Sequence, residues 1–234
     1  MHILAIDTSN QALGVALLKD NEVVGEFVTN LAKNHSVRLM PAIDYLMKEV
    51  NIIPEQLDKI VVAKGPGSYT GVRIGLTTAK TLAWSLNIPI IGVSSLEALA
   101  YSAMFSNSLI CPFFDARRGL VYTGLYEGKN SKLDLVEEER NTLFSDWLDH
   151  LADKKKKVVF LSPDIAKHAE LIKERMGEYA EIPVMAYHTA KPSNLAIAAS
   201  DKEDDDTHTL TPNYLRLAEA EANWLKAQKD KQNG

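Results

Sequence analysis

Residues 64–75 read Lys-Gly-Pro-Gly-Ser-Tyr-Thr-Gly-Val-Arg-Ile-Gly. This glycine-rich loop follows the short apolar run Lys59–Ala63, which is typical of a buried strand, and it opens a helix that we predict over Thr70–Leu86. A loop of this kind can present backbone amides to an anion. It is not a P-loop, because no Gly-Lys-Ser/Thr sequence closes it, and it is not a Rossmann fingerprint, because it follows an interior strand.

The chain before this loop has the pattern of three strands followed by a helix. We expect strands over Ile3–Asp7, Gly14–Leu18 and Glu22–Val28, and a helix over Ser36–Val50. The first strand ends in Asp7-Thr8-Ser9, an aspartate followed by small hydroxyl residues.

After the loop, the sequence predicts a strand over Pro89–Val93 and a helix that starts with a Ser94–Glu97 capping box. The opening pattern then begins again with Cys111-Pro112-Phe113-Phe114-Asp115, another apolar strand that ends in an aspartate. Asp7 and Asp115 hold the same place in two similar halves, which indicates a duplicated architecture. We therefore predict an α/β protein with an N-terminal domain over residues 1–104, completed by a C-terminal helix over 213–230, and a smaller domain over 105–212.

Composition excludes several classes of protein. A formal net charge of −5 and a sequence pI near 5.7 give no electrostatic footprint for nucleic acid, so we expect contact with RNA only through a partner. The single cysteine, Cys111, excludes an intrachain disulfide framework and fits a reducing compartment. The sequence shows no secretory signal and no apolar stretch long enough to span a membrane, so we expect a cytoplasmic protein without a membrane partner.

Four segments together closely resemble the TsaB (YeaZ) family. They are Ile6-Asp7-Thr8-Ser9, the glycine-rich loop, Asp115-Ala116-Arg117 and Pro212-Asn213-Tyr214-Leu215-Arg216. The resemblance runs through most of the chain and implies the actin-like ATPase (ASKHA) fold, with two ribonuclease-H-like domains whose mixed central sheets are flanked by helices. In relatives with this fold, the turn after the first strand faces a nucleotide phosphate and its metal. The residues of a vestigial nucleotide site would be Asp7, Thr8, Ser9, Gly65, Gly67 and Asp115.

The same resemblance implies a role in bacterial synthesis of N6-threonylcarbamoyladenosine at position 37 of tRNAs that read codons starting with adenine. The chain would be a non-catalytic scaffold that dimerises with the catalytic subunit TsaD and is joined by the small ATPase TsaE. A separate enzyme makes threonylcarbamoyl-adenylate. We expect no firmly bound cofactor, and we leave open a homodimer and weak binding of ATP or ADP with Mg²⁺ at the level of the complex.

The catalytic relative carries a His-Leu-Glu-Gly-His metal motif, and the comparable stretch here is Ser95-Leu96-Glu97-Ala98-Leu99. Two imidazoles four residues apart on a helix can bind a metal ion together, whereas the hydroxyl of Ser95 and the isobutyl group of Leu99 cannot. The remaining histidines are scattered, with no two at helical ligand spacing, so we predict no metal site. We assign no function to His35, which lies beside the first helix.

The two helices of the first half carry side chains outside the stripes that a sheet would cover. In the first, Leu39, Ile43, Leu46 and Val50 make the inward stripe. An exposed Trp beside an Arg, as in the second helix, is a common composition at interfaces. We predict a partner interface that consists of Val37, Met40, Met47, Arg73, Thr77, Lys80 and Trp84. The alternative is a helix pair that is wholly buried in the core.

A second function is also open at this point, that of an ATP-dependent phosphotransferase or ATPase of the actin and sugar-kinase superfamily. Asp7 and Asp115 would face Mg²⁺ across a cleft, an arrangement suited to phosphoryl transfer. The loop after Asp7 argues against it, because it offers Gln11-Ala12-Leu13 rather than a lysine or a glycine pair.

Overall fold

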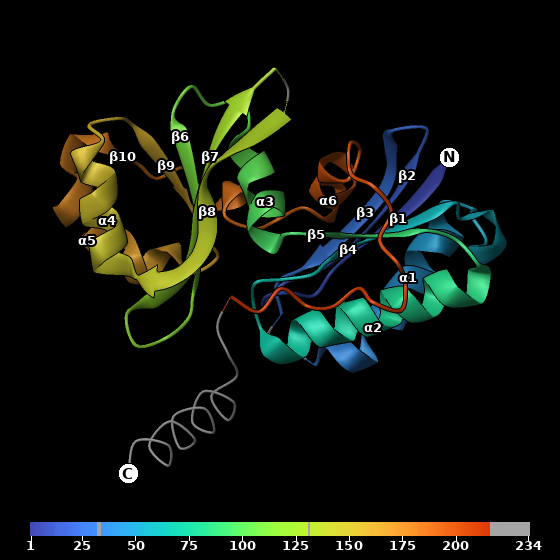
Figure 1. Ribbon diagram of the computed structural model, residues 1–234. Coiled ribbons are helices and arrows are strands. Elements are labelled where there is room, and N and C mark those ends of the chain that lie inside the picture. Colours follow the sequence, from blue (N-terminus) through green and yellow to red (C-terminus); the bar gives the residue numbers. More distant parts are fainter. Residues whose placement is uncertain (32–33, 131, 216–234) are drawn as a thin grey trace, which may run out of the picture.

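The computed structural model describes residues 1–31, 34–130 and 132–215. Two five-stranded mixed sheets dominate it, and each forms the centre of one lobe (Figure 1). The first lobe contains β1 (His2–Asp7), β2 (Leu13–Lys19), β3 (Glu22–Thr29), β4 (Lys59–Ala63) and β5 (Ile90–Val93). The second contains β6 (Leu109–Asp115), β7 (Leu120–Lys129), β8 (Lys132–Leu143), β9 (Val158–Leu161) and β10 (Ala180–Glu181).

The two sheets have the same topology. Their strand orders are β3-β2-β1-β4-β5 and β10-β9-β6-β7-β8. In each, the central strand pairs antiparallel with its hairpin partner and parallel with the next strand on its other side. The central strands β1 and β6 end in Asp7 and Asp115, so the duplication predicted from these two aspartates is confirmed.

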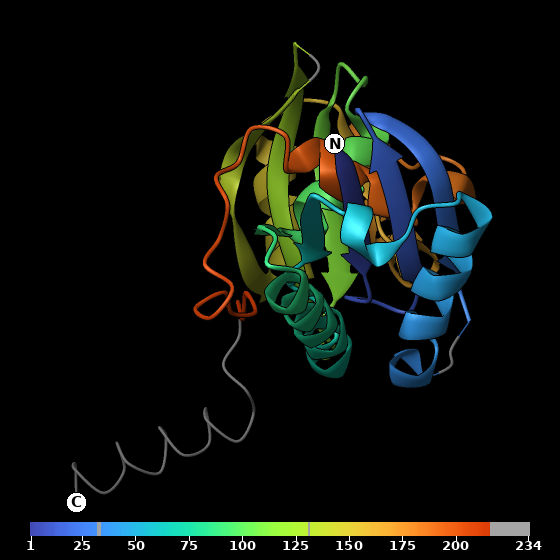
Figure 2. The same ribbon diagram turned by 90° about the vertical axis from the view of Figure 1, so that its right-hand side faces the viewer.

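The helices are α1 (Leu39–Glu49), α2 (Tyr69–Leu86), α3 (Ser95–Ala100), α4 (Phe144–Asp153), α5 (Ile165–Met176) and α6 (Pro192–Ala198). α1 and α2 lie next to each other on one face of the first sheet, and α6 lies on the other face (Figures 1 and 2). Successive residues of β1 face opposite layers, with Ile6 in the core under α1 and α2 and Ala5 in the core under α6. Within the described ranges, no helix is both long and apolar enough to cross a lipid bilayer.

α3 lies between the lobes. Its Ala98 belongs to the core under α6, whereas Leu96 and Leu99 pack against the second sheet. Ser94 caps the helix, because its hydroxyl accepts hydrogen bonds from the amides of Leu96 (3.1 Å) and Glu97 (3.4 Å). The Glu97 carboxylate, expected to complete a capping box, instead forms an ion pair with Lys202 at 3.0 Å.

The predicted end of the second domain at residue 212 needs correction. Leu195 of α6 shares a core with Ile3 and Val61 of the first sheet, so α6 belongs to the first lobe. Residues 201–214, which we call the strap, then run along the edge of β5, where the Asp205 amide donates to the Ile90 carbonyl at 2.8 Å. The predicted helix over 213–230 lies outside the described residues beyond 215, and residues 213–215 are not helical.

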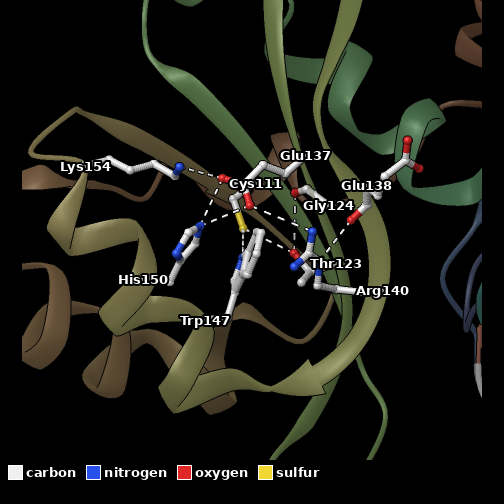
Figure 3. A network of polar contacts seen from close by, with 9 residues as sticks. All are labelled: Cys111, Thr123, Gly124, Glu137, Glu138, Arg140, Trp147, His150 and Lys154. Atoms are coloured by element: carbon white, nitrogen blue, oxygen red, sulfur yellow. Dashed lines mark hydrogen bonds and ion pairs between the residues drawn. The ribbon is translucent and has the colours of Figure 1, made fainter.

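In the second lobe, a polar network fastens α4 to the sheet (Figure 3). Glu137 of β8 accepts from Lys154 at 2.6 Å and lies 3.0 Å from the ring of His150. The indole N–H of Trp147 donates to the sulfur of Cys111 at 3.4 Å. Burial raises the pKa of the Cys111 thiol to about 11, so this cysteine is a core residue and not a nucleophile, as its apolar sequence context indicated.

The state of Cys111 can be tested by alkylation at pH 7.4. We expect the native protein to react with iodoacetamide about 100-fold more slowly than free cysteine, because the thiol is buried and its raised pKa leaves almost no thiolate. Reactivity should return in guanidinium chloride, and an exposed Ser85→Cys variant should react without denaturant. Rapid native labelling of Cys111 would contradict the structure.

Candidate functional site

The glycine-rich loop lies directly against the turn that follows β1. The Ser68 amide donates to the Ser9 carbonyl at 2.7 Å, and the Thr8 hydroxyl donates to the Gly71 carbonyl at 2.7 Å. A Cβ atom on Gly67 would lie 2.2 Å from the Ser9 oxygen, and one on Gly71 would lie 2.2 Å from the Thr8 oxygen. These two glycines are therefore required by backbone-to-backbone packing inside the protein.

In the first turn of α2 and in the turn that follows Asp7, polar groups form hydrogen bonds with other groups of the same chain. Ser68 caps α2, with its hydroxyl accepting from the Gly71 amide at 3.2 Å. Asp7 is buried, and one of its carboxylate oxygens accepts from the Ser9 amide at 2.8 Å. Burial raises the pKa of Asp7, so the carboxylate is costly to ionise where it lies.

A cleft of about 620 Å³ lies between the lobes, next to this loop. Gly67 and Ser68 line it from the first lobe, and Asp115 and Arg117 line it from the second. Of the residues predicted for a vestigial nucleotide site, Gly67 and Asp115 reach this cleft. The others, which are buried residues outside its lining, are Asp7, Thr8, Ser9 and Gly65.

Asp115 already has partners within the chain. One of its carboxylate oxygens accepts from the Arg117 amide at 2.9 Å, and the other lies 3.5 Å from the ammonium of Lys167. The same ammonium is 2.6 Å from Asp164, and these two carboxylates raise the pKa of Lys167. A divalent cation between Asp115 and Asp164 would therefore compete with a positive charge that the chain itself supplies.

The segment that was compared with the metal motif of the catalytic relative is a packed helix. Ser95, Leu96 and Leu99 are fully buried in α3, between the lobes. Among the residues that the structure describes, no group of three or more His, Cys, Asp or Glu side chains could hold a metal ion. His35 contacts the cleft, but its Nε2 donates to the Asn10 carbonyl at 2.8 Å, so it fastens the loop after β1.

The exposed faces of α1 and α2 carry large apolar side chains, as the sequence predicted. Trp84 of α2 is 68% exposed and Met40 of α1 is 48% exposed, and Val37, in the turn before α1, is 67% exposed. A groove of about 470 Å³ runs beside Met40 between α1, Ile53 and Leu82. Met47 is 6% exposed and packs in the core under the two helices, and it also lines this groove, so it lies at the inner wall of the predicted interface.

The strap passes beside α2 (Figure 1). It forms hydrogen bonds with Arg73 and Lys80 of this helix. The Arg73 guanidinium lies 3.9 Å from the centre of the Tyr69 ring and donates to the Tyr214 hydroxyl at 2.6 Å. Lys80 donates to the carbonyls of His208 (3.1 Å) and Leu210 (2.9 Å). The sequence prediction missed these intramolecular contacts, and it also missed Tyr45, which is exposed on α1 beside Phe27.

Two lobes of identical topology, with a glycine-rich loop and two strand-end aspartates around an interlobe cleft, define a protein of the actin-like (ASKHA) fold. The family model for TsaD, tRNA N6-adenosine threonylcarbamoyltransferase, matches residues 22–224. The tRNA threonylcarbamoyladenosine biosynthesis protein TsaB of Bacillus subtilis is 54% identical over 229 residues, which cover 98% of this chain and 100% of the relative. The chain belongs to this TsaD-like family and, within it, to the TsaB (YeaZ) proteins.

Solved structures agree with this assignment. A Pseudomonas aeruginosa protein described as similar to peptidase YeaZ superimposes with a TM-score of 0.76 at 25% identity. The match covers 92% of this chain and 99% of that chain. The two-lobed architecture is therefore shared along nearly the full length of both proteins.

Substitution of Gly71 by alanine tests the close approach of the loop. An alanine normally stabilises a helix relative to glycine, but here its Cβ would meet the Thr8 carbonyl oxygen. We expect a loss of about 2 kcal/mol or more in the free energy of unfolding, measured by urea denaturation. The exposed neighbour Thr70→Ala should change it by no more than about 0.5 kcal/mol. An unchanged or more stable Gly71→Ala variant would show that the contact is not required.

Proposed function

We propose that this chain is a non-catalytic subunit in the synthesis of N6-threonylcarbamoyladenosine at position 37 of tRNAs that read codons starting with adenine. In this proposal it docks on a TsaD-type catalytic subunit and activates it. Family membership supports the pathway. The packed α3 at the position of the metal motif supports a scaffold rather than an enzyme, because Ser95 and Leu99 offer no metal-binding pair.

The observation that carries the docking proposal is the outer face of α1 and α2. Trp84 of α2, Met40 of α1 and Val37 in the turn before α1 expose large apolar side chains in one lobe, and Met40 lines an apolar groove. Such a patch is costly in water and is characteristic of a protein contact, with a central tryptophan as the usual anchor. A partner that presents an apolar helical surface would fill the groove and cover these side chains.

The remaining members of the complex follow from the same proposal. A TsaE-type ATPase joins the pair, and tRNA is bound by the assembly, since a net charge of −5 does not favour binding of a polyanion by this chain itself. A homodimer of the chain would use the same apolar face when the catalytic partner is missing. We further propose a cytoplasmic location, where the substrate tRNA is found.

We propose that nucleotide binds this chain weakly and that firm binding of ATP or ADP with Mg²⁺ needs the complex. The open cleft beside Gly67 and Asp115 favours some binding. Two contacts argue against firm binding. The carboxylate of Asp7 already accepts a hydrogen bond from the Ser9 amide, and Lys167 already forms an ion pair with Asp115. The alternative of an autonomous ATPase or phosphotransferase would need these groups to be released.

Reconstitution tests the scaffold function. The purified chain is assayed for tRNA modification and ATP turnover by itself, and then with a TsaD-type subunit, a TsaE-type ATPase, ATP, threonylcarbamoyl-adenylate and tRNA. We expect modification only in the mixture that contains both the chain and the TsaD-type subunit. Modification or substantial ATP turnover by the chain by itself would overturn the proposal.

The docking face is tested by placing a charge on it. Trp84→Glu and Met40→Glu should each weaken association with the TsaD-type subunit by about 30-fold or more in titration calorimetry, because a carboxylate would be buried without a partner. Circular dichroism should show an unchanged monomer, since both side chains are exposed. Val184→Glu, an equally exposed position on the second lobe, is the matched control and should bind normally. Unaltered binding by both face variants would exclude this surface.

A further inference from the structure

Glu139 of β8 is a carboxylate held between the lobes. Its Oε1 accepts from the Tyr126 hydroxyl at 2.5 Å and also from the hydroxyl of Ser94. Its Oε2 accepts from the side-chain amide of Asn213 at 3.3 Å. These donors come from three separate parts of the chain: a strand of the second lobe, the cap of the interlobe helix α3, and the end of the strap.

The surroundings of Glu139 make a charged group expensive there. It lines a polar pocket of about 510 Å³ together with Glu97, Glu138, Lys64 and Lys202. Burial raises the pKa of Glu139, and the nearby Glu97 carboxylate raises it further, while Lys64 acts in the opposite direction. A partly buried carboxylate of this kind is weak support for stability as such, so its position calls for another explanation.

The contacts of Glu139 continue to the start of α2. The backbone amide of Asn213 donates to the carbonyl of Lys64, the first residue of the glycine-rich loop, at 2.7 Å. The next residue, Tyr214, stacks on Tyr69 with ring centres 5.5 Å apart and accepts from Arg73 at 2.6 Å. Asn213 is therefore the junction between the second lobe and the first turn of α2.

We propose that Glu139 is a positioning residue for the docking helix. Through Asn213 it fixes the end of the strap, and the strap in turn holds Tyr69 and Arg73 of α2 in one arrangement before the partner arrives. A carboxylate suits this position because it accepts from three donors at once without supplying a donor of its own. A contact residue that is ordered in advance loses less conformational freedom on binding. The link to docking rests on the proposed function, whereas the effect on α2 does not.

Amide hydrogen exchange tests the structural half of this proposal without any partner. Glu139→Ala should speed exchange in peptides that cover residues 64–75 by about threefold or more, and leave residues 39–49 of α1 unchanged. Asn213→Ala should have the same effect, and the double variant should be no worse than either single variant because both act at one junction. Glu139→Gln keeps the carbonyl acceptor for the two hydroxyls, and its amide nitrogen can donate to the side-chain oxygen of Asn213 once the Asn213 amide turns over, so this variant should restore most of the protection.

The matched control is Glu138→Ala, a neighbouring exposed carboxylate of the same strand and pocket, which should exchange like the parent protein. Unchanged exchange over residues 64–75 in both Glu139→Ala and Asn213→Ala would overturn the proposal. Equal acceleration in Glu138→Ala would overturn it as well. Should Glu139→Ala fail to fold by circular dichroism, Asn213→Ala and Glu139→Gln still decide between these outcomes.

The second readout is affinity for the TsaD-type subunit. Glu139→Ala and Asn213→Ala should each weaken binding about threefold or more, with Glu139→Gln close to the parent. Parent-like affinity in both alanine variants, with Trp84→Glu defective, would refute the positioning effect and leave the docking face intact. If the parent itself does not bind, the proposed function is wrong, and the exchange experiment alone judges the influence of Glu139 on α2.

Discussion

The close approach between the glycine-rich loop and the turn after β1 is the contact on which the rest of the molecule depends. Two backbone segments meet with no room for a side chain at Gly67 or Gly71. This contact sets where α2 begins, and α2 supplies both one wall of the interlobe cleft and half of the exposed apolar face. One steric constraint at the backbone therefore positions two surfaces with different uses.

The same contact supports the proposal that this ATPase-like fold serves as a scaffold. Groups that could meet a phosphate or a metal are largely occupied inside the chain: the Ser68 amide by the Ser9 carbonyl, and Asp115 by Lys167. Polar groups that are satisfied internally gain little from a ligand, because binding would first have to break existing hydrogen bonds. The lobes keep their arrangement, while the apolar side chains on the outside of α1 and α2 remain exposed to solvent.

Local pattern made most of the fold predictable. The strands, the start of α2 and the equivalence of Asp7 and Asp115 follow from residue periodicity and turn chemistry, which act over a few residues. Met47 shows a limit of helical periodicity: it lies about 40° around the helix from the buried Ile43 and about 20° from the exposed Met40, so the spacing alone does not decide whether its side chain is buried.

Long-range contacts were beyond the reach of such reasoning. Arg73 and Tyr214 are 141 residues apart in sequence, and Lys80 and Leu210 are 130 residues apart. No local sequence pattern therefore predicts that the strap lies against one side of the predicted interface. The predicted domain boundary was wrong for a related reason. The small residues of α6 give no compositional sign that the chain has returned to the first sheet, and only the packing of Leu195 against Ile3 and Val61 reveals it.

The return of α6 and the strap has a consequence for biosynthesis. The core between the second sheet and the helices α4 and α5 is built from residues 109–176, a continuous stretch, whereas the first sheet needs residues from both ends of the chain. On a ribosome, β1 to β5 emerge first but wait for Leu195 to cover their second face and for Asp205 to pair with the edge of β5. The lobe that is translated first is thus the last to be finished, and its unprotected sheet is the part of the nascent protein most exposed to aggregation.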